Sequence, residues 1–400
     1  MRVLHLLDHS APRRSDYSRR TLALLEGLRT QGVQTIHLTG PGHGAAGSAD
    51  SGPEHWHFYR TSTPARLERL GPRLGTAART AALALRLRQV ARLTRPDLIH
   101  VHLPTWNALA ALPVAHLARV PLVVEAERRA GLSPAPGPGL SSWLERRALG
   151  AVQAIATGTA QVRAQLRTEL RAGGVAAARI AVVPPAPDLQ ACRLPAALRP
   201  GLAPPGLEGA PLLAYAGGLE PEDGIGLLLA ALGVLRRRHP ALRLLVAGGG
   251  EREAGLADTL GAPGLRGHVV FAGSVSYRRA ADLLPRADIA VFPAMAAART
   301  LAPSRHLLNA MAQGCAIVAS DIDCHRELLV HGHSGILFPS GSRAALVEAV
   351  GALLEAPRRL AALGAQAASY VESRRSWEAT AARYRQLYER VLADSGRSRR

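Results

Sequence analysis

Short apolar runs alternate with longer segments of helical spacing along the first half of the chain. The runs predict six strands, over Val3–Leu7, Val33–Leu38, Leu98–His102, Leu122–Glu125, Ala154–Thr157 and Ile180–Val183. Apolar residues at every third or fourth position predict helices between them, over Tyr17–Arg29, Ala78–Leu93, Trp106–Leu117, Ser142–Leu149 and Thr159–Leu170. Strands that alternate with helices of this length indicate parallel βαβ units and an α/β fold.

The alternation stops in the middle of the chain and then restarts. The segment 184–211 is dense in proline and glycine, which predicts an interdomain linker. Strands are then predicted over Leu212–Ala216, Leu242–Ala247, Val269–Phe271, Ile289–Phe292, Ala316–Ala319 and Ile336–Phe338. Helices are predicted over Gly226–Arg238, Arg278–Leu284, Ser304–Gln313, Ala344–Glu355 and Trp377–Leu392.

At 400 residues the chain is too long for one ordinary core. We expect two doubly wound, Rossmann-like domains over 1–190 and 211–375, a linker over 191–210 and a C-terminal helix over 376–400. Such sheets bind ligands at the carboxyl ends of their strands, so we expect the site in a central cleft between the two sheets.

The charge is strongly positive, with 49 basic and 30 acidic residues and a net charge of +19. All 49 basic residues are arginine, a bias typical of a GC-rich genome, which weakens the total as evidence for nucleic acid. The charge is also uneven: residues 1–200 carry a net +14 and residues 201–400 a net +5. A solvated helical surface explains this asymmetry as well as an anionic substrate or membrane surface does.

The remaining composition favours a cytoplasmic protein. Three cysteines without paired spacing imply neither a disulfide framework nor a zinc site. The opening MRVLHLLDHS has no secretory pattern, and no apolar stretch approaches the length of a membrane span.

The second half carries the specific motifs, YAGGLEPEDGIGLLLAAL, LLVAGGG and NAMAQGCAIVASD, the last followed by a glutamate and HGHSG. In this order and spacing the chain resembles the retaining, glycogen-synthase-like glycosyltransferases of family 4, which have the GT-B fold. The N-terminal segments RVLHLLDHSAPRRSDYSRRTLALLEGL and DLIHVHLPTWNALAAL look like the sugar transferases found beside exosortase and exopolysaccharide systems. The resemblance implies a retaining hexosyltransferase in exopolysaccharide biosynthesis, and a last helix that crosses back onto the N-terminal domain.

The resemblance also implies where the donor binds. Backbone N–H groups of glycine-rich turns and helix N-termini suit a nucleotide diphosphate. The expected donor contacts in the second domain are Gly217, Gly218, Gly248, Gly249, Thr300, Arg305, His306, Leu308 and Asn309. On spacing alone, tight strand-to-helix turns are the better explanation of the glycines, and the resemblance is what favours donor contact.

The family's charged residues are missing at their usual positions. Its diphosphate-binding Arg and Lys fall on Gly218 and Asp223, and the two glutamates of its E-x(7)-E pattern fall near Thr300 or Leu301 and on Asn309. In the N-terminal domain the family's glycine-rich phosphate loop falls on a segment without glycine, with Ser10, Ser15, Asp16 and Tyr17 as candidate contacts. His102 and Glu125 end strands there and are the candidate catalytic residues on the acceptor side; a satisfied loop residue is the alternative for each.

No cofactor and no metal is expected. The D-x-D pattern at 321–323 follows a predicted strand, which favours a turn over a metal site. No aromatic platform or module indicates nucleic acid. The sequence therefore predicts a glycosyltransferase that moves a sugar from a nucleotide-sugar to a polysaccharide or lipid-linked acceptor, peripheral at the inner face of an anionic membrane. The alternative is a non-catalytic GT-B homologue that binds a sugar nucleotide or a partner without turnover, because five expected residues are absent together.

Overall fold

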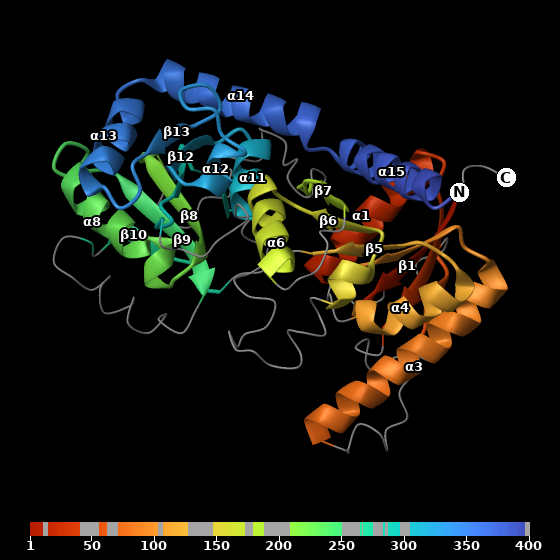
Figure 1. The fold of residues 1–400 in the computed structure, drawn as a ribbon. Helices are drawn as coiled ribbons and strands as arrows, with labels where there is room; N and C mark the ends of the chain where they lie inside the picture. Colours follow the sequence, from red (N-terminus) through yellow and green to blue (C-terminus); the bar gives the residue numbers. More distant parts are fainter. Residues whose placement is uncertain are drawn as a thin grey trace. The chain divides into compact units, whose positions relative to one another are not determined.

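The structure is a computed structural model of the whole chain, and it describes residues 1–10, 15–40, 56–61, 71–102, 107–126, 147–172, 179–187, 209–249, 265, 267–274, 283–284, 287–296 and 305–396. The chain divides into two compact units. Unit 1 is Met1–Pro185 with Trp377–Arg400, and unit 2 is Ala186–Ser376. Each is an α/β layer fold (Figure 1).

Unit 1 is built on a seven-stranded parallel sheet of order β3-β2-β1-β4-β5-β6-β7. Its strands are β1 (Arg2–Leu7), β2 (Gln34–Thr39), β3 (Phe58–Arg60), β4 (Leu98–Val101), β5 (Leu122–Glu125), β6 (Ala154–Thr157) and β7 (Arg179–Val182). Its helices are α1 (Asp16–Thr30), α3 (Gly71–Thr94), α4 (Asn107–Ala118), α6 (Ala160–Ala172) and α15 (Trp377–Asp394). The strand order reverses beside β1, which is the switch point where doubly wound sheets bind ligands.

The core of unit 1 joins the two ends of the chain. Buried residues of α1, such as Leu24 and Leu28, pack with Tyr384 and Tyr388 of α15 against one face of the sheet. Gly27 is required there, because a Cβ on it would contact the backbone oxygen of Trp377 at 3.1 Å. On α15 the packing residues recur at helical spacing, so the last helix presents one apolar stripe to the sheet.

Unit 2 has a six-stranded parallel sheet of order β10-β9-β8-β11-β12-β13. Its strands are β8 (Leu212–Gly218), β9 (Arg243–Gly249), β10 (Val269–Phe271), β11 (Ile289–Phe292), β12 (Ala316–Ser320) and β13 (Ile336–Phe338). Its helices are α8 (Ile225–Leu235), α11 (Arg305–Ala312), α12 (Asp323–Arg326), α13 (Arg343–Leu354) and α14 (Pro357–Arg374), with the 3-10 turn η4 (Pro221–Asp223) before α8. Helices α8 and α13 cover one face and α11 and α14 the other.

The sequence predicted nearly every strand to within two residues, and the fold class is confirmed. Three elements were not predicted: β3, α12 and α14. Strand β3 has only three residues at a sheet edge, too few for a pattern, and α14 follows α13 after a break of two residues, so the periodicity does not separate them. Residues 278–282 of the predicted helix over 278–284, and the start of the one over 142–149, lie outside the described residues. Among the described helices none is both long and apolar enough to span a membrane.

Candidate active site

His102 and Glu125 meet at the carboxyl edge of the sheet of unit 1. Glu125 is the last residue of β5 and His102 directly follows β4, its neighbour in the sheet. The parallel register therefore places them side by side, with Nδ1 of His102 3.2 Å from Oε1 of Glu125. Both are buried, with exposed fractions of 2% and 7%. The structure thus brings together the two residues predicted to be catalytic.

Glu125 is ionised in this setting. Burial alone would raise the pKa of its carboxyl group, but the His102 imidazole, by its charge and by its hydrogen bond, and the nearby His100 together bring that pKa well below the usual range. His102, His100 and Tyr384 all approach Oε1. Among the described residues no hydrogen bond is made to Oε2, so the described contacts all fall on one carboxylate oxygen.

A row of histidines lies beside this pair. His5 of β1 is in register with His37 of β2 and with His100 of β4, so the three imidazoles share a sheet face. Nδ1 of His5 lies 3.0 Å from Nε2 of His102, and the row is buried. Burial lowers the pKa of His5 and of His100 well below the ordinary value, and the other imidazoles act in the same direction. Both rings are therefore neutral near pH 7.

This row could hold a metal ion, although the sequence analysis found no histidine pattern for one. One nitrogen from each of His5, His100 and His102 lies within 4.8 Å of the others. The Nε2 atoms of His5 and His100 are buried without a hydrogen-bond partner. The signal in the sequence was the His-x-His spacing of residues 100 and 102; His5 comes from a strand that is adjacent only in the fold.

Two tyrosines of α15 complete the cluster. The Tyr384 hydroxyl donates to Oε1 of Glu125 at 2.5 Å, and the Tyr388 hydroxyl lies 2.7 Å from Nδ1 of His100. Burial, and then the Glu125 charge, raise the pKa of both phenols well above the ordinary value, so both remain protonated. The sequence analysis missed these residues because helical spacing of aromatics indicates core packing, which they also provide.

The segment before α1 is held by its own side chains. Ser15 caps α1 by accepting from the backbone N–H of Ser18, and its Oγ lies 2.6 Å from Nε2 of His9. Asp8 fixes the other His9 nitrogen at 2.9 Å. Tyr17 accepts from the backbone N–H of Asp8, and burial raises the pKa of its phenol.

Ser10 and Asp16 are the other predicted contacts of this segment. Ser10 is buried, and Asp16 is the first residue of α1; its side chain lies outside the described residues.

In unit 2 the predicted glycines come together at one sheet edge. Gly217 and Gly218 end β8, and they pair in register with Gly248 and Gly249, which end β9. A Cβ on Gly248 would collide with the backbone oxygen of Gly217, so the two strand ends approach too closely for any side chain. The other glycines of the edge are also closely packed, since a Cβ on Gly217 would meet the Tyr215 hydroxyl and a Cβ on Gly249 would meet the Ser274 side chain.

A carboxylate lies beside Gly218. A Cβ on Gly218 would collide with the Asp223 carboxylate, so the two positions are immediate neighbours. Asp223 accepts from the backbone N–H of Glu220 at 3.2 Å, which fixes it at the end of η4. These are the two positions at which the resemblance predicted the family's phosphate-binding Arg and Lys to be replaced.

The remaining predicted donor contacts lie in or near α11. Arg305 is exposed at its start and His306 is half-buried. Leu308 packs in the apolar core of unit 2, so its side chain serves packing. Asn309 is fully buried. Thr300 lies outside the described residues.

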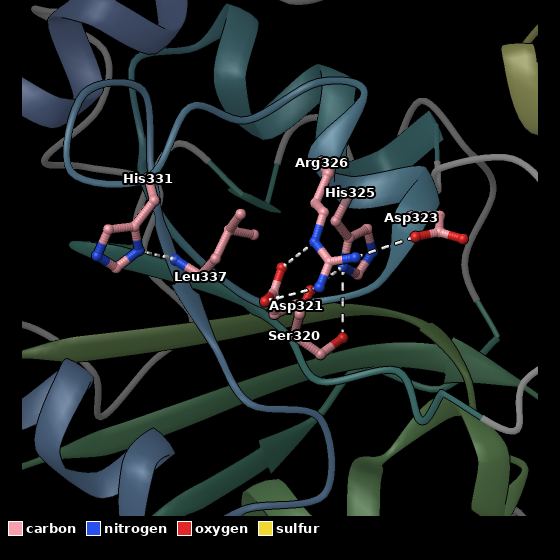
Figure 2. Close-up of polar contacts among 7 residues, drawn as sticks. All are labelled: Ser320, Asp321, Asp323, His325, Arg326, His331 and Leu337. Carbon is pink, nitrogen blue, oxygen red and sulfur yellow. Dashed lines mark hydrogen bonds and ion pairs between the residues drawn. The ribbon is translucent and has the colours of Figure 1, made fainter.

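The D-x-D segment is a turn stabilised by arginine. Arg326 donates to both oxygens of Asp321 and to Asp323, and His325 donates to the backbone oxygen of Ser320 at 2.8 Å (Figure 2). The hydrogen bond from Arg326 lowers the pKa of Asp321. Both carboxylates are thus satisfied within the turn, as the spacing predicted.

Comparison with known proteins identifies the class. The family model for glycosyl transferases group 1 matches residues 210–356, and that for the glycosyl transferase 4-like domain matches residues 17–186. Glycogen synthase of Mycobacterium tuberculosis is 32% identical over 326 residues, covering 79% of this chain and 74% of that protein. Phosphatidyl-myo-inositol mannosyltransferase of Mycolicibacterium smegmatis is 33% identical over 172 residues, 43% of each chain.

Solved structures agree on the fold. Sucrose-phosphate synthase from Thermosynechococcus elongatus superposes with a TM-score of 0.74 at 18% identity, covering 98% of this chain and 100% of that one. HepE of Anabaena, in complex with UDP and glucose, gives a TM-score of 0.69 at 18% identity over 98% and 100% of the two chains. The fold is therefore GT-B, with two Rossmann-like domains. The chain belongs to the family 4 glycosyltransferases, enzymes that act on nucleotide-sugars.

Proposed function

We propose that this protein transfers a hexose, with retention of anomeric configuration, from a nucleotide-sugar to a hydroxyl group of a polysaccharide or lipid-linked acceptor. Its relatives support both parts: HepE is seen with UDP and glucose, and one relative is named for a phosphatidylinositol acceptor. In the reaction the bond from the sugar's anomeric carbon to the diphosphate breaks and a bond to the acceptor oxygen forms. The hydroxyl proton leaves with the diphosphate.

The observation that carries the proposal is the ionised Glu125 at the carboxyl edge of unit 1, whose described contacts all fall on Oε1. A carboxylate whose pKa lies far below neutrality is a poor proton acceptor, so its role is not to deprotonate the hydroxyl. It accepts the hydrogen bond of the acceptor hydroxyl, which orients the oxygen, and it stabilises positive charge on the sugar in the transition state. His102 holds the other oxygen of the carboxylate in place.

The donor is proposed to bind in unit 2. The glycine edge of β8 and β9 lets a diphosphate approach the backbone, and Arg305 and His306 at the start of α11 are the nearest described cationic candidates on the family motif. The reaction requires neither a cofactor nor a metal in this proposal, because the backbone and these side chains neutralise the leaving group.

Glu125→Gln tests the proposal in purified protein. We expect kcat for transfer to fall by about 100-fold, as for removal of one transition-state charge contact, with little change in UDP affinity. Glu389→Gln is the matched control, since Glu389 is an exposed partner of Arg385 on α15. The anomeric configuration of the product, read by NMR, tests retention. Transfer by Glu125→Gln at the wild-type rate would contradict the role of Glu125, and an inverted product would contradict retention.

One observation favours a second function, a sugar-nucleotide binder without turnover. Asp223 beside Gly218 replaces the family's phosphate cations with a negative charge. Calorimetric binding of UDP-sugars by wild-type protein that neither transfers nor hydrolyses them, over a panel of donors and acceptors, would establish this second function in place of the first.

A further inference from the structure

The C-terminal helix of unit 1, α15, packs against the sheet and also makes polar contacts with residues at the carboxyl edge of that sheet. Tyr384 and Tyr388 are four residues apart on α15, so both rings lie on the face that covers β1, β4 and β5. Each hydroxyl meets a polar atom of the sheet, one on Glu125 and one on His100. Phenylalanine would fill nearly the same space, so packing alone does not explain the two hydroxyl groups.

The two carboxylate oxygens of Glu125 differ in their contacts. The Tyr384 hydroxyl, at 2.5 Å, and His102, at 3.2 Å, both approach Oε1, and His100 stands 3.8 Å from the same atom. Since Tyr384 is protonated, it is an O–H donor to a carboxylate, one of the stronger classes of hydrogen bond. This donor and the imidazole fix the plane of the carboxylate from two elements of the fold.

We propose that Tyr384 is a positioning residue of the transferase: its hydroxyl locks Oε1 of Glu125, so that Oε2 is held for the acceptor hydroxyl. The inference rests on the proposed function of Glu125. It makes the last helix, more than 250 residues from Glu125 along the chain, part of the acceptor site.

A metal ion in the histidine row is the competing arrangement. The nitrogens of His5, His100 and His102 are close enough for one. The hydrogen-bond distances favour an arrangement without an ion: Nδ1 of His102 lies 3.2 Å from Oε1 of Glu125, and its Nε2 lies 3.0 Å from Nδ1 of His5. Both nitrogens of His102 thus already have a partner within the protein, and a bound ion would displace the His5 contact.

Tyr384→Phe tests the proposal, with Tyr370→Phe on α14 as the matched control in unit 2. We expect kcat to fall about tenfold, the equivalent of one charge-assisted hydrogen bond, while KM for the donor is unchanged.

A measurement without turnover accompanies the kinetics. The carboxyl of Glu125 is followed by ¹³C NMR in protein labelled at glutamate Cδ and assigned by the Glu125→Gln spectrum. We expect its chemical shift at pH 7 to change in Tyr384→Phe and to stay unchanged in Tyr370→Phe. Groups that face Glu125 and are retained in all variants are Tyr17 and Arg20 of α1, His100 and His102 at β4, and Tyr388 of α15.

The outcomes separate the hypotheses. An unchanged kcat and an unchanged Glu125 carboxyl chemical shift in Tyr384→Phe would overturn the positioning role alone, whereas wild-type transfer by Glu125→Gln would overturn the proposed function. One equivalent of tightly bound zinc that disappears in His5→Ala would overturn the hydrogen-bonded arrangement on which the inference stands. If Tyr384→Phe does not fold, 3-fluorotyrosine at position 384 replaces it; this stronger donor of similar size should change the Glu125 carboxyl chemical shift at pH 7, and an unchanged shift contradicts the proposal.

Discussion

At the residue scale, one carboxylate lies at the carboxyl edge of each sheet, Glu125 in unit 1 and Asp223 in unit 2. Glu125 is stabilised in its charged form by imidazole and phenol groups, so unit 1 offers an anionic edge that is fully organised. Asp223 in unit 2 accepts from the backbone N–H of Glu220. Under the proposed function, the carboxylate of unit 1 would orient an acceptor hydroxyl and that of unit 2 would oppose a diphosphate.

Asp223→Asn tests whether the Asp223 charge repels a bound diphosphate. The amide oxygen can still accept from the backbone N–H of Glu220, so the turn is retained while the charge is removed. We expect UDP to bind about threefold more tightly at low salt, roughly the effect of one repulsive charge a few ångströms away in a high-dielectric setting.

Isothermal titration calorimetry measures this effect, and Asp321→Asn is its control because Asp321 pairs with Arg326 on the surface of the same unit. Equal gains in the two variants would show that net charge alone is responsible. An unchanged affinity in Asp223→Asn would place the diphosphate away from Gly218.

At the element scale, a single tight turn at Gly224 connects β8, through η4, to α8. Gly224 ends η4 and caps α8 with φ of 80°, a left-handed conformation that favours glycine. A Cβ there would also collide with the backbone oxygen of Pro293, which follows β11. This turn sets where Asp223 stands relative to the glycine edge.

Gly224→Ala should destabilise the protein by about 1–3 kcal/mol, the range for a strained φ combined with overpacking. Gly233→Ala, within the same helix and with open space around it, should instead stabilise by about 0.5–1 kcal/mol. Urea unfolding followed by far-UV circular dichroism measures both. A neutral Gly224→Ala would contradict the tight approach of the turn to Pro293.

At the scale of the whole molecule, several buried histidines of unit 1 make its stability sensitive to acid, and His325 of unit 2 acts in the same direction. His5, His37 and His100 are buried and neutral when folded, and burial is the main cause of each lowered pKa. In the unfolded chain the same residues take up a proton below about pH 6.5. Because the unfolded state then binds more protons, the free energy of unfolding decreases as the pH falls below 6.5. For His37 the decrease ends near its folded pKa of about 4.

His37→Phe tests this linkage. Each such histidine adds about 1.4 kcal/mol per pH unit to the slope of unfolding free energy against pH. Without His37, that slope between pH 6 and 4.5 should become shallower by about this amount. All four tryptophans lie in residues 1–185 or 377–400, so their fluorescence reports on unit 1 during urea unfolding. His333→Phe, at an exposed position of unit 2, should leave the slope unchanged. An unchanged slope in His37→Phe would mean that this imidazole is protonated in the folded protein.

The sequence by itself determined the local elements, the parallel α/β class and the places where strands end. Hydrophobic periodicity reports which face of each segment is buried, and glycines such as Gly217 and Gly248 mark tight strand ends. It also singled out His102 and Glu125, because both end strands in a fold that binds ligands at carboxyl edges.

Only the tertiary structure decided what surrounds those residues. His5 meets His100 and His102 because β1 lies beside β4 in the sheet, although nearly a hundred residues separate them. Tyr384 reaches Glu125 because the last helix packs on the first sheet, a contact for which periodicity shows a buried stripe and no partner. The protonation of Glu125 depends on burial and on these neighbours together, and both are properties of the assembled fold.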